Sequence, residues 1–393
     1  MTGDDTDLAV RLRTIREKLG FSQDDVARLT GQPRPVVSNW ETGVRRPNTH
    51  QLDKLAKIYR TPLAELRGEY AQPRPDFQGL MFRDAGDRLD AKGRFEIQRF
   101  LAFLDIYGDL LEGLGEPAGL SHSPFAVHEG FMSKEDIRRR AEDARAYFRL
   151  GPGPITSLDG VADVAGITVY RAPLGSDLRG TVSGAFLPHD RVGFSILING
   201  ETTPGRQQFT LAHEIAHALF HGDRLYVNYF GRRERAERFA NVFAGEFLVP
   251  THHLRATVEA LGISKLSDPE TVVHLQRYYR VSYDMILVRL SQANLILPDE
   301  VTRLREIRPV HLATRLGYSV EPDEWVQDPE CWGLTRFPPR LLRLLRRAHA
   351  EGKITIGGAA AMTSLAAEDI EELLMDQPEH EQEDEFGYLS ESA

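Results

Sequence analysis

The sequence predicts a multidomain, mainly α protein with an N-terminal five-helix unit, an α+β domain with a small sheet, and a mostly helical C-terminal region. Three observations lead to this prediction. Apolar residues recur at helical spacing through the first 60 residues, and three short strand-like runs lie together between residues 167 and 198. The third is the length of 393 residues, since chains of this size divide into roughly two to four domains.

Composition indicates a soluble globular protein. Hydrophobic residues make up 41% and charged residues 27% of the chain, which are ordinary proportions for this class. No apolar run approaches the roughly 18 residues of a membrane span, and the first residues lack the basic and apolar segments of a signal peptide. We therefore expect a cytoplasmic protein with no membrane partner. The single cysteine, Cys331, excludes an internal disulfide and disfavours a thiolate zinc site.

Charge is distributed unevenly along the chain. The formal net charge is −10, which by itself argues against a nucleic-acid partner. Residues 8–68, however, hold 12 Lys and Arg against 6 Asp and Glu, a local charge of +6. The last 18 residues hold 7 acidic residues and no Lys or Arg. The average therefore conceals a basic N-terminal segment and an acidic tail.

The N-terminal segment predicts a compact unit of five helices. Apolar spacing predicts a first helix over residues 8–19. Ser22 is a suitable N-cap for a second helix, and Pro33 suits the first position of a third. A fourth helix follows from Leu52 to Tyr59, and a short fifth begins near Pro62. Two short helices joined by a tight turn inside such a unit form a helix-turn-helix.

A longer pattern runs through this unit. It reads Ser22-Gln23-x-x-x-Ala27-x-x-x-Gly31, then Val37-Ser38-x-Trp40-Glu41-x-Gly43-x-Arg45-Arg46-Pro47, then Leu52-x-x-Leu55-Ala56. This pattern resembles the Cro/C1-type (XRE-family) helix-turn-helix of phage and bacterial repressors over residues 8–68. The resemblance implies binding to a double-stranded DNA operator, and a homodimer that occupies two half-sites.

The resemblance also implies that the third helix lies in the major groove. Arg can bond guanine bidentately and Asn can bond adenine, so both suit direct readout. Gln23 matches a position that grips a phosphate, and Arg45 and Arg46 would add backbone contacts. The residues predicted to contact DNA are Gln23, Arg34, Pro35, Ser38, Asn39, Arg45 and Arg46. The Pro33 and Pro35 pair departs from the family pattern, and the alternative is that the basic surface is only a solvated face.

Residues 69–130 predict a helical connector. Pro73 and Pro75 predict an extended start. A strongly apolar helix then runs from Phe95 to Leu111 and carries no groups arranged for chemistry. We expect this helix to pack onto the following domain or onto a second subunit.

Residues 131–292 predict the α+β domain. Two helices are expected first, over residues 133–148 and 158–165. Strand-like runs follow at 167–170, 182–186 and 193–198, before a helix over 209–220. Helices that flank a small sheet are the arrangement of many zinc peptidases, so the fold is expected to be zincin-like.

The helix over 209–220 carries His213, Glu214 and His217. Residues four apart share a helix face, so the two imidazoles can converge on one zinc ion. Glu214 projects beside them, where it can take a proton from a water held by the metal. In a chain with 13 His this short pattern alone has modest specificity.

A catalytic zinc of this kind takes three protein ligands and keeps one open position. His221 extends the series, but eight residues of regular helix separate it from His213 by about 12 Å along the axis. Only a break in the helix before His221 would bring it to the metal, so a supporting or structural role is favoured.

The next acidic candidates are Glu234, Glu237 and Glu246, on one predicted helix. Ala240, Asn241 and Ala244 share a face with Glu237. Small residues on that face would let the two helices pack closely and deliver Glu237 to the metal.

The two predicted helices together carry a second resemblance. The pattern is Phe209-Thr-Leu-Ala-His213-Glu214-Ile-Ala-His217, then Glu237-x-x-Ala240-Asn241-x-Phe243-Ala244, then Phe247-Leu248-x-Pro250. It resembles the ImmA/IrrE family of metallopeptidases over roughly residues 133–290. The resemblance implies that His213, His217 and Glu237 hold the metal and that Glu214 is the catalytic base. It also implies a repressor of the helix-turn-helix type as a possible substrate. The candidates for an oxyanion donor are His221, Tyr226, Tyr229 and Arg238.

The two resemblances predict a bacterial DNA-binding transcriptional regulator that carries a zinc-dependent, repressor-cleaving peptidase domain. One alternative is a protease that cleaves a separate helix-turn-helix repressor. The other is a pseudo-enzyme, in which the metallopeptidase fold only senses a ligand or partner.

The C-terminal region resembles no family. Residues 293–375 predict further helices, with a basic strip for which a solvated face is the default interpretation. That strip consists of Arg340, Arg343, Arg346 and Arg347. Residues 376–393 form the acidic tail, which we expect to be disordered.

Overall fold

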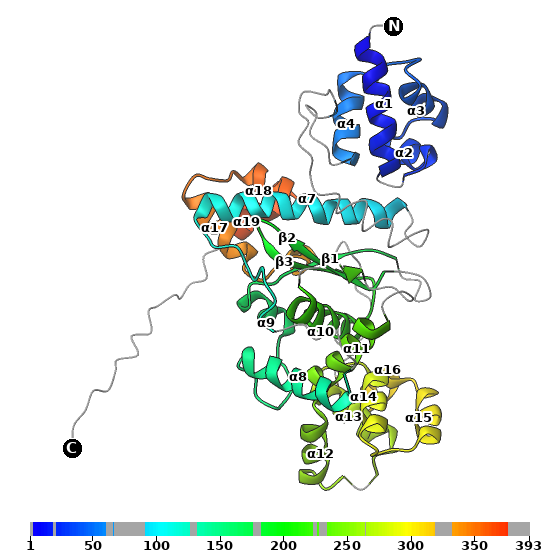
Figure 1. The fold of residues 1–393 in the computed structure, drawn as a ribbon, viewed down its shortest axis with the longest axis vertical. Helices are drawn as coiled ribbons and strands as arrows, with labels where there is room; N and C mark the ends of the chain where they lie inside the picture. The colour runs from blue at the N-terminus through cyan, green and yellow to red at the C-terminus, as the bar shows by residue number, and fades with distance from the viewer. Residues whose placement is uncertain are drawn as a thin grey trace, which may run out of the picture. The chain divides into compact units, whose positions relative to one another are not determined.

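The computed structural model describes residues 3–18, 21–59, 66, 91–125, 132–175, 182–222, 226–227, 234–263, 265–318 and 332–375 (Figure 1). The chain divides into two units, residues 1–339 and 340–393. The interdomain link at residues 68–75 and the acidic tail at 376–393 lie outside the described residues. No helix in the described part of the chain has the length and apolar character that a bilayer crossing requires.

The N-terminal helices form the expected helix-turn-helix. They are α1 (Gly3–Lys18), α2 (Gln23–Thr30), α3 (Arg34–Glu41) and α4 (Thr49–Tyr59). Ser22 closes a capping box with Asp25 at the start of α2, and Gly31, at φ 66°, makes the turn towards α3. Pro33 is the N-cap of α3 and not its first residue, because its backbone is extended (ψ 142°). The fifth helix expected near Pro62 lies mostly outside the described residues.

A buried ion pair fixes α3 within this domain. Nε of Arg16 in α1 lies 2.6 Å from Oε1 of Glu41 at the end of α3. The side chains of Val37 and Trp40 are buried in the domain core. One face of α3 thus packs in the domain core, and its opposite face is accessible to solvent.

The sheet of the second domain has the strand order β1-β3-β2-β4. Its strands are β1 (Thr168–Ala172), β2 (Gly184–His189), β3 (Gly193–Asn199) and β4 (Tyr226–Val227). β1 runs parallel to β3, while β2 is antiparallel to both β3 and β4. The first three strands confirm the prediction. β4 has only two residues, too few for the alternating pattern that identifies a strand.

Helices cover both faces of this sheet (Figure 1). α10 (Pro204–His221) lies on one face, in a common core with Val169 and Ile196 of the strands. α7 (Ala91–Leu114) packs on the other face, where the ring of Phe103 lies 5.1 Å from that of Tyr170. Alternate residues of β1 therefore supply two cores. The predicted connector helix packs onto the following domain, which is one of the two outcomes expected.

Further helices of the first unit follow in the described part of the chain. They are α8 (Lys134–Tyr147), α9 (Leu158–Val164), α11 (Glu234–Leu248), α12 (Thr251–Ala260), α13 (Pro269–Tyr279), α14 (Tyr283–Gln292), α15 (Pro298–Arg305), α16 (Pro309–Arg315) and the 3-10 helix η4 (Gly333–Arg336). α11 packs against both α10 and α8. This position makes α11 the inner helix of the group.

The second unit contains α17 (Leu341–Ala350), α18 (Ile356–Thr363) and α19 (Ala367–Met375). α17 buries Leu341, Leu344 and Leu345 and exposes Arg343 and Arg347. The other two arginines of the basic strip, Arg340 and Arg346, are partly buried, and Nε of Arg346 donates to the carbonyl of Leu373 over 2.9 Å. The solvated face expected for the strip therefore holds for only two of its four residues.

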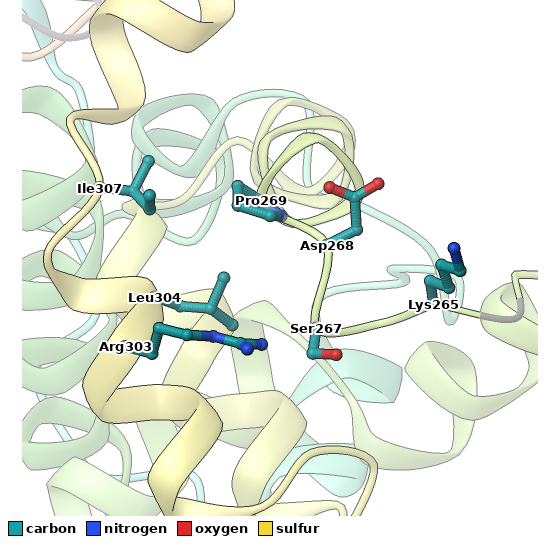
Figure 2. Close-up of a pocket in the computed structure, with 7 residues that line it drawn as sticks. All are labelled: Lys265, Ser267, Asp268, Pro269, Arg303, Leu304 and Ile307. Carbon is teal, nitrogen blue, oxygen red and sulfur yellow. The ribbon is translucent and has the colours of Figure 1, made fainter.

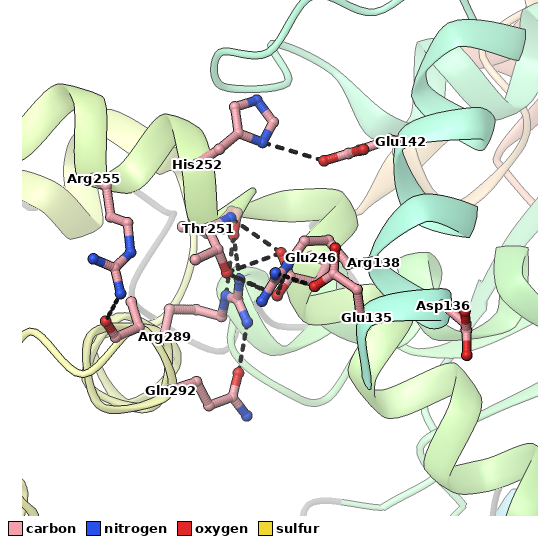
Figure 3. A network of polar contacts seen from close by, with 12 residues as sticks. Glu135, Asp136, Arg138, Glu142, Glu246, Thr251, His252, Arg255, Arg289 and Gln292 are labelled. Atoms are coloured by element: carbon pink, nitrogen blue, oxygen red, sulfur yellow. Dashed lines mark hydrogen bonds and ion pairs between the residues drawn. The ribbon is translucent and has the colours of Figure 1, made fainter. Parts of the chain in front are cut away.

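A buried polar network holds the C-terminal end of α11 (Figure 3). Nη2 of Arg289 in α14 lies 2.8 Å from Oε1 of Glu246, and its Nε donates to the carbonyl of Val249 over 3.0 Å. The backbone N–H of Thr251 also donates to Glu246. The Arg289 and Glu246 side chains are only 2% and 7% exposed. The network therefore satisfies two buried charges and a helix-end carbonyl together.

We expect Arg289→Met to destabilise this domain by about 3 kcal/mol, because it removes the nearer counter-ion of the buried Glu246 carboxylate and leaves Arg138, whose Nε lies 3.5 Å from Oε1 of Glu246. Hydrogen exchange of the buried α11 amides measures the loss within this domain alone. The matched control is Arg305→Met, whose partner Asp284 is 62% exposed and whose loss we expect to be under about 1 kcal/mol. Equal effects of the two substitutions would contradict the role given to the network.

Candidate metal centre and nucleic-acid interface

The buried helix α10 positions the two histidines. Pro204 stands at its first turn, where a missing backbone N–H has no consequence. His213 and His217 follow one turn apart, and their side chains are only 1% and 0% exposed. Their Nε2 atoms lie 3.2 Å from each other. The helical spacing thus brings two imidazole nitrogens to one point.

α11 brings Glu237 to the same point. Its Oε2 lies 3.2 Å from Nε2 of His213, and its Oε1 lies 3.5 Å from Nε2 of His217. The facing side of α11 carries Ala240 and Ala244, both fully buried. Because these side chains are small, the two helices can approach closely. His213, His217 and Glu237 form one group of potential metal ligands in the described part of the chain.

The distances within this group fit a zinc ion. Ligand atoms at about 2.0–2.2 Å from a tetrahedral zinc stand roughly 3.3–3.6 Å apart. Here the two Nε2 atoms lie 3.2 Å apart, and the two Glu237 oxygens lie 3.2 Å and 3.5 Å from the Nε2 atoms of His213 and His217, respectively. Two imidazoles and one carboxylate are also a donor set of catalytic zinc sites, which keep a fourth position open.

The charge of Glu237 suits the same function. Burial raises the pKa of its carboxyl, but hydrogen bonds from His213 and His217 outweigh burial and bring the pKa to about 2. Glu237 is therefore ionised at neutral pH and available as a ligand.

Glu214 lies beside the group and is fully buried. The backbone of β2 passes directly over it, since a Cβ atom added to Gly184 would lie 3.1 Å from Oε1 of Glu214. The same atom would lie 2.6 Å from Cγ2 of Thr210, which is too close for any side chain. Only glycine lets the strand approach the catalytic candidate this closely.

Of the four candidates for an oxyanion donor, the structure describes the side chains of His221 and Arg238. Nδ1 of His221 lies 3.3 Å from Nδ1 of His217, on the opposite side of that ring from Glu237. Arg238 is exposed on α11, next to Glu237. Tyr229 and the side chain of Tyr226 lie outside the described residues.

The predicted DNA-contacting residues lie on α2, on α3 and in the loop after α3. Arg34 and Pro35 are exposed at the start of α3, and Ser38 and Asn39 are partly buried further along it. Arg45 and Arg46 are exposed in the loop.

Gln23 has a partner that the sequence did not suggest. Its Nε2 donates to Oε2 of Glu41 over 3.0 Å, so the amide is held by the same carboxylate that pairs with Arg16. Glu41 thus joins α1, α2 and α3. Arg16 and Gln23 lie 25 and 18 residues from Glu41, so no local sequence pattern predicts these two contacts.

A cavity of about 490 Å³ lies away from both candidate sites (Figure 2). It is lined by Lys265, Ser267, Asp268, Pro269, Arg303, Leu304 and Ile307. None of the predicted site residues contributes to it. The cavity therefore belongs to neither candidate site.

Two protein-family models match the chain. One describes a helix-turn-helix and covers residues 12–66. The other describes an IrrE N-terminal-like domain and covers residues 162–291. The matched ranges contain the predicted DNA-contacting residues and the four predicted metal-site residues, respectively.

Two curated proteins are similar to part of the chain. The radiation response metalloprotease IrrE of Deinococcus radiodurans is 35% identical over 147 residues, which cover 35% of this chain and 42% of the relative. The protein of the same name from Deinococcus deserti is 41% identical over 92 residues, which cover 22% of this chain and 30% of the relative. The chain thus spans less than half the length of these relatives.

A solved structure also aligns with the chain, the apo form of the competence regulator ComR from Streptococcus vestibularis. It covers 89% of this chain and 99% of its own, with an identity of 11% and a TM-score of 0.17. The chain thus contains one segment that matches the helix-turn-helix model and one that matches the IrrE N-terminal-like model, as the two resemblances predict.

Proposed function

We propose that this chain is a DNA-binding transcriptional regulator whose second domain is a zinc-dependent peptidase. The observation that carries the proposal is the convergence of the Nε2 atoms of His213 and His217 with the two carboxylate oxygens of Glu237, at 3.2 to 3.5 Å, beside the buried carboxylate of Glu214. The helix-turn-helix domain in the same chain supports the regulatory part. His213, His217 and Glu237 would hold the metal, and Glu214 would be the general base.

The chemistry is that of peptide hydrolysis. A bound zinc ion would lower the pKa of a water molecule and polarise the carbonyl of the scissile peptide. Glu214 accepts the proton from the attacking water at a carboxylate oxygen and returns it to the leaving amide nitrogen. The complete burial of Glu214 keeps bulk water from this proton transfer.

The proposed substrate is a repressor protein of the helix-turn-helix type, either a separate protein or this chain. The two relatives are named radiation response metalloproteases, which supports proteolysis in a regulatory setting. The chain's own helix-turn-helix domain would bring the peptidase to the DNA sites where such repressors are bound.

The proposed operator contact is made by the exposed face of α3. Arg34 would hydrogen-bond a guanine edge and Asn39 an adenine edge. Arg45 and Arg46 would contact phosphates. In the free domain Nε of Arg34 lies 3.5 Å from Oδ1 of Asp24, and both side chains are more than 60% exposed. This pair is weak enough to be exchanged for a base contact. Two half-sites would be occupied by a homodimer.

Glu237→Ala should remove zinc from the purified chain, because it deletes one of three ligands, while Glu214→Gln should retain zinc and lose proteolysis by about 10²–10⁴-fold. Elemental analysis of dialysed protein and cleavage assays on candidate repressors, including the chain itself, test both effects. Glu259→Ala, an exposed carboxylate on α12, is the control. Stoichiometric zinc in Glu237→Ala would refute the ligand set. Full cleavage by Glu214→Gln would refute the general base.

Arg34→Ala combined with Asn39→Ala should weaken binding to a duplex selected by the wild-type chain from random DNA by about 10²-fold or more, because two base contacts are lost. Arg45→Ala should weaken binding to all duplexes alike and lower the salt dependence by about one counter-ion. Fluorescence anisotropy across a salt series measures both. Arg13→Ala on α1, which removes an equal charge, should change neither. Unchanged binding by the double variant would exclude α3 as the base-contacting helix.

A further inference from the structure

Each of the two histidines of the proposed metal centre also has a polar neighbour at Nδ1, the ring nitrogen remote from Glu237. Nδ1 of His213 lies 3.1 Å from Oδ1 of Asn241, and Nδ1 of His217 lies 3.3 Å from Nδ1 of His221. The Nε2 atoms of both rings instead point to each other and to Glu237. The two nitrogens of each ring therefore have separate surroundings.

This division has a chemical consequence. A neutral imidazole carries one proton, so a ring that offers its Nε2 lone pair to a metal must carry that proton on Nδ1. The proton then requires an acceptor, because both rings are buried and a buried donor without a partner is unfavourable. The amide oxygen of Asn241 and the Nδ1 lone pair of His221 are those acceptors.

We infer that Asn241 and His221 are positioning residues, which fix the tautomer and the ring orientation of the two metal-binding histidines. The inference rests on the metal centre proposed above. Partners of this kind typically change metal affinity by about 10–100-fold, so we expect effects of that size here. Neither residue is assigned a contact with substrate.

Asn241 links the third ligand to the first. It stands one turn after Glu237 on α11, so both side chains project to the same side of that helix. Glu237 meets His213 at Nε2, and Asn241 meets it at Nδ1. α11 thus supplies the polar partner of each ring nitrogen of His213. Any shift of α11 would disturb the ligand set and the orientation of His213 together.

His221 holds the other ring from within α10. It follows His217 by one turn, and its own ring stands edge-on to Phe239 of α11 at 5.6 Å and 89°. This contact restricts rotation of His221 and so directs its Nδ1 towards His217. The sequence had suggested His221 as a ligand or a supporting residue, and the geometry favours the second.

Two matched pairs of substitutions test this inference in the full-length chain. Asn241→Leu and His221→Phe keep the approximate size of the side chain but remove the acceptor. Asn241→Asp and His221→Gln keep an acceptor oxygen. Zinc affinity is measured by competition with a chromophoric chelator, and the absorption spectrum of the Co²⁺-loaded protein reports the ligand arrangement without any assay of activity.

We expect Asn241→Leu and His221→Phe each to weaken zinc binding by about 10–100-fold and to alter the Co²⁺ spectrum. Asn241→Asp and His221→Gln should remain within about threefold of the wild type, or bind more tightly, because the acceptor is restored. Val242→Ala, an apolar change at the next position of α11, should have no effect on affinity. Thermal unfolding of the metal-free proteins shows whether each variant folds.

The outcomes separate this inference from the proposed function. Wild-type zinc affinity in Asn241→Leu and His221→Phe would overturn the positioning roles but leave the metal centre intact. Equal losses in both members of a pair would also overturn them, since packing alone would then explain the effect. A wild-type chain without measurable zinc affinity would overturn the metal centre, and the positioning roles with it.

Discussion

The close packing of α10 against α11 is the contact on which the candidate metal centre depends. In the proposed centre, α10 would supply two ligands and the general base but not a third ligand, because its next histidine lies one turn too far along the axis. α11 can supply that ligand only if the two helix axes approach closely. Ala240 and Ala244 permit the approach, and the network of Arg289 and Glu246 fixes the far end of α11. Arg145 reinforces this end, since its guanidinium donates to the carbonyl of Phe247.

The sheet also restricts the position of α10. β2 passes over Glu214 with no room for a side chain at Gly184, so the sheet sets how deeply the general base is buried. α7 covers the opposite face through Phe103 and Tyr170. Arg336 of η4 also reaches this face, where it donates to Glu96 of α7 and to the carbonyl of Arg171. Segments on both sides of the matched peptidase range therefore complete the support of the sheet.

In the helix-turn-helix domain, one buried carboxylate holds three helices together. Glu41 is buried and joined to both Arg16 and Gln23, so three helices are held around the end of α3. The residues proposed to contact DNA lie on or beside this helix but take no part in the core. This separation lets the exposed face of α3 vary with the operator while the core stays unchanged.

The sequence by itself determined the features that depend on local periodicity. Helical spacing placed His213, Glu214 and His217 together, Ser22 marked a helix start, and strand-like apolar runs located three strands. The fold class followed from these patterns, whereas the two domain types were implied by the resemblances to known families. Glu237 could be chosen because small residues share its face of α11.

Only the tertiary structure decided what depends on contacts distant in sequence. The short β4, the ion pair of Arg289 with Glu246, the hydrogen bond of Gln23 to Glu41, and the contact of Asn241 with Nδ1 of His213 left no periodic signal. The last three contacts join residues that lie 18 to 43 positions apart, and their geometry depends on how elements pack rather than on which elements form. Periodicity identifies which face of an element is buried, whereas the side chain that it meets is set by packing.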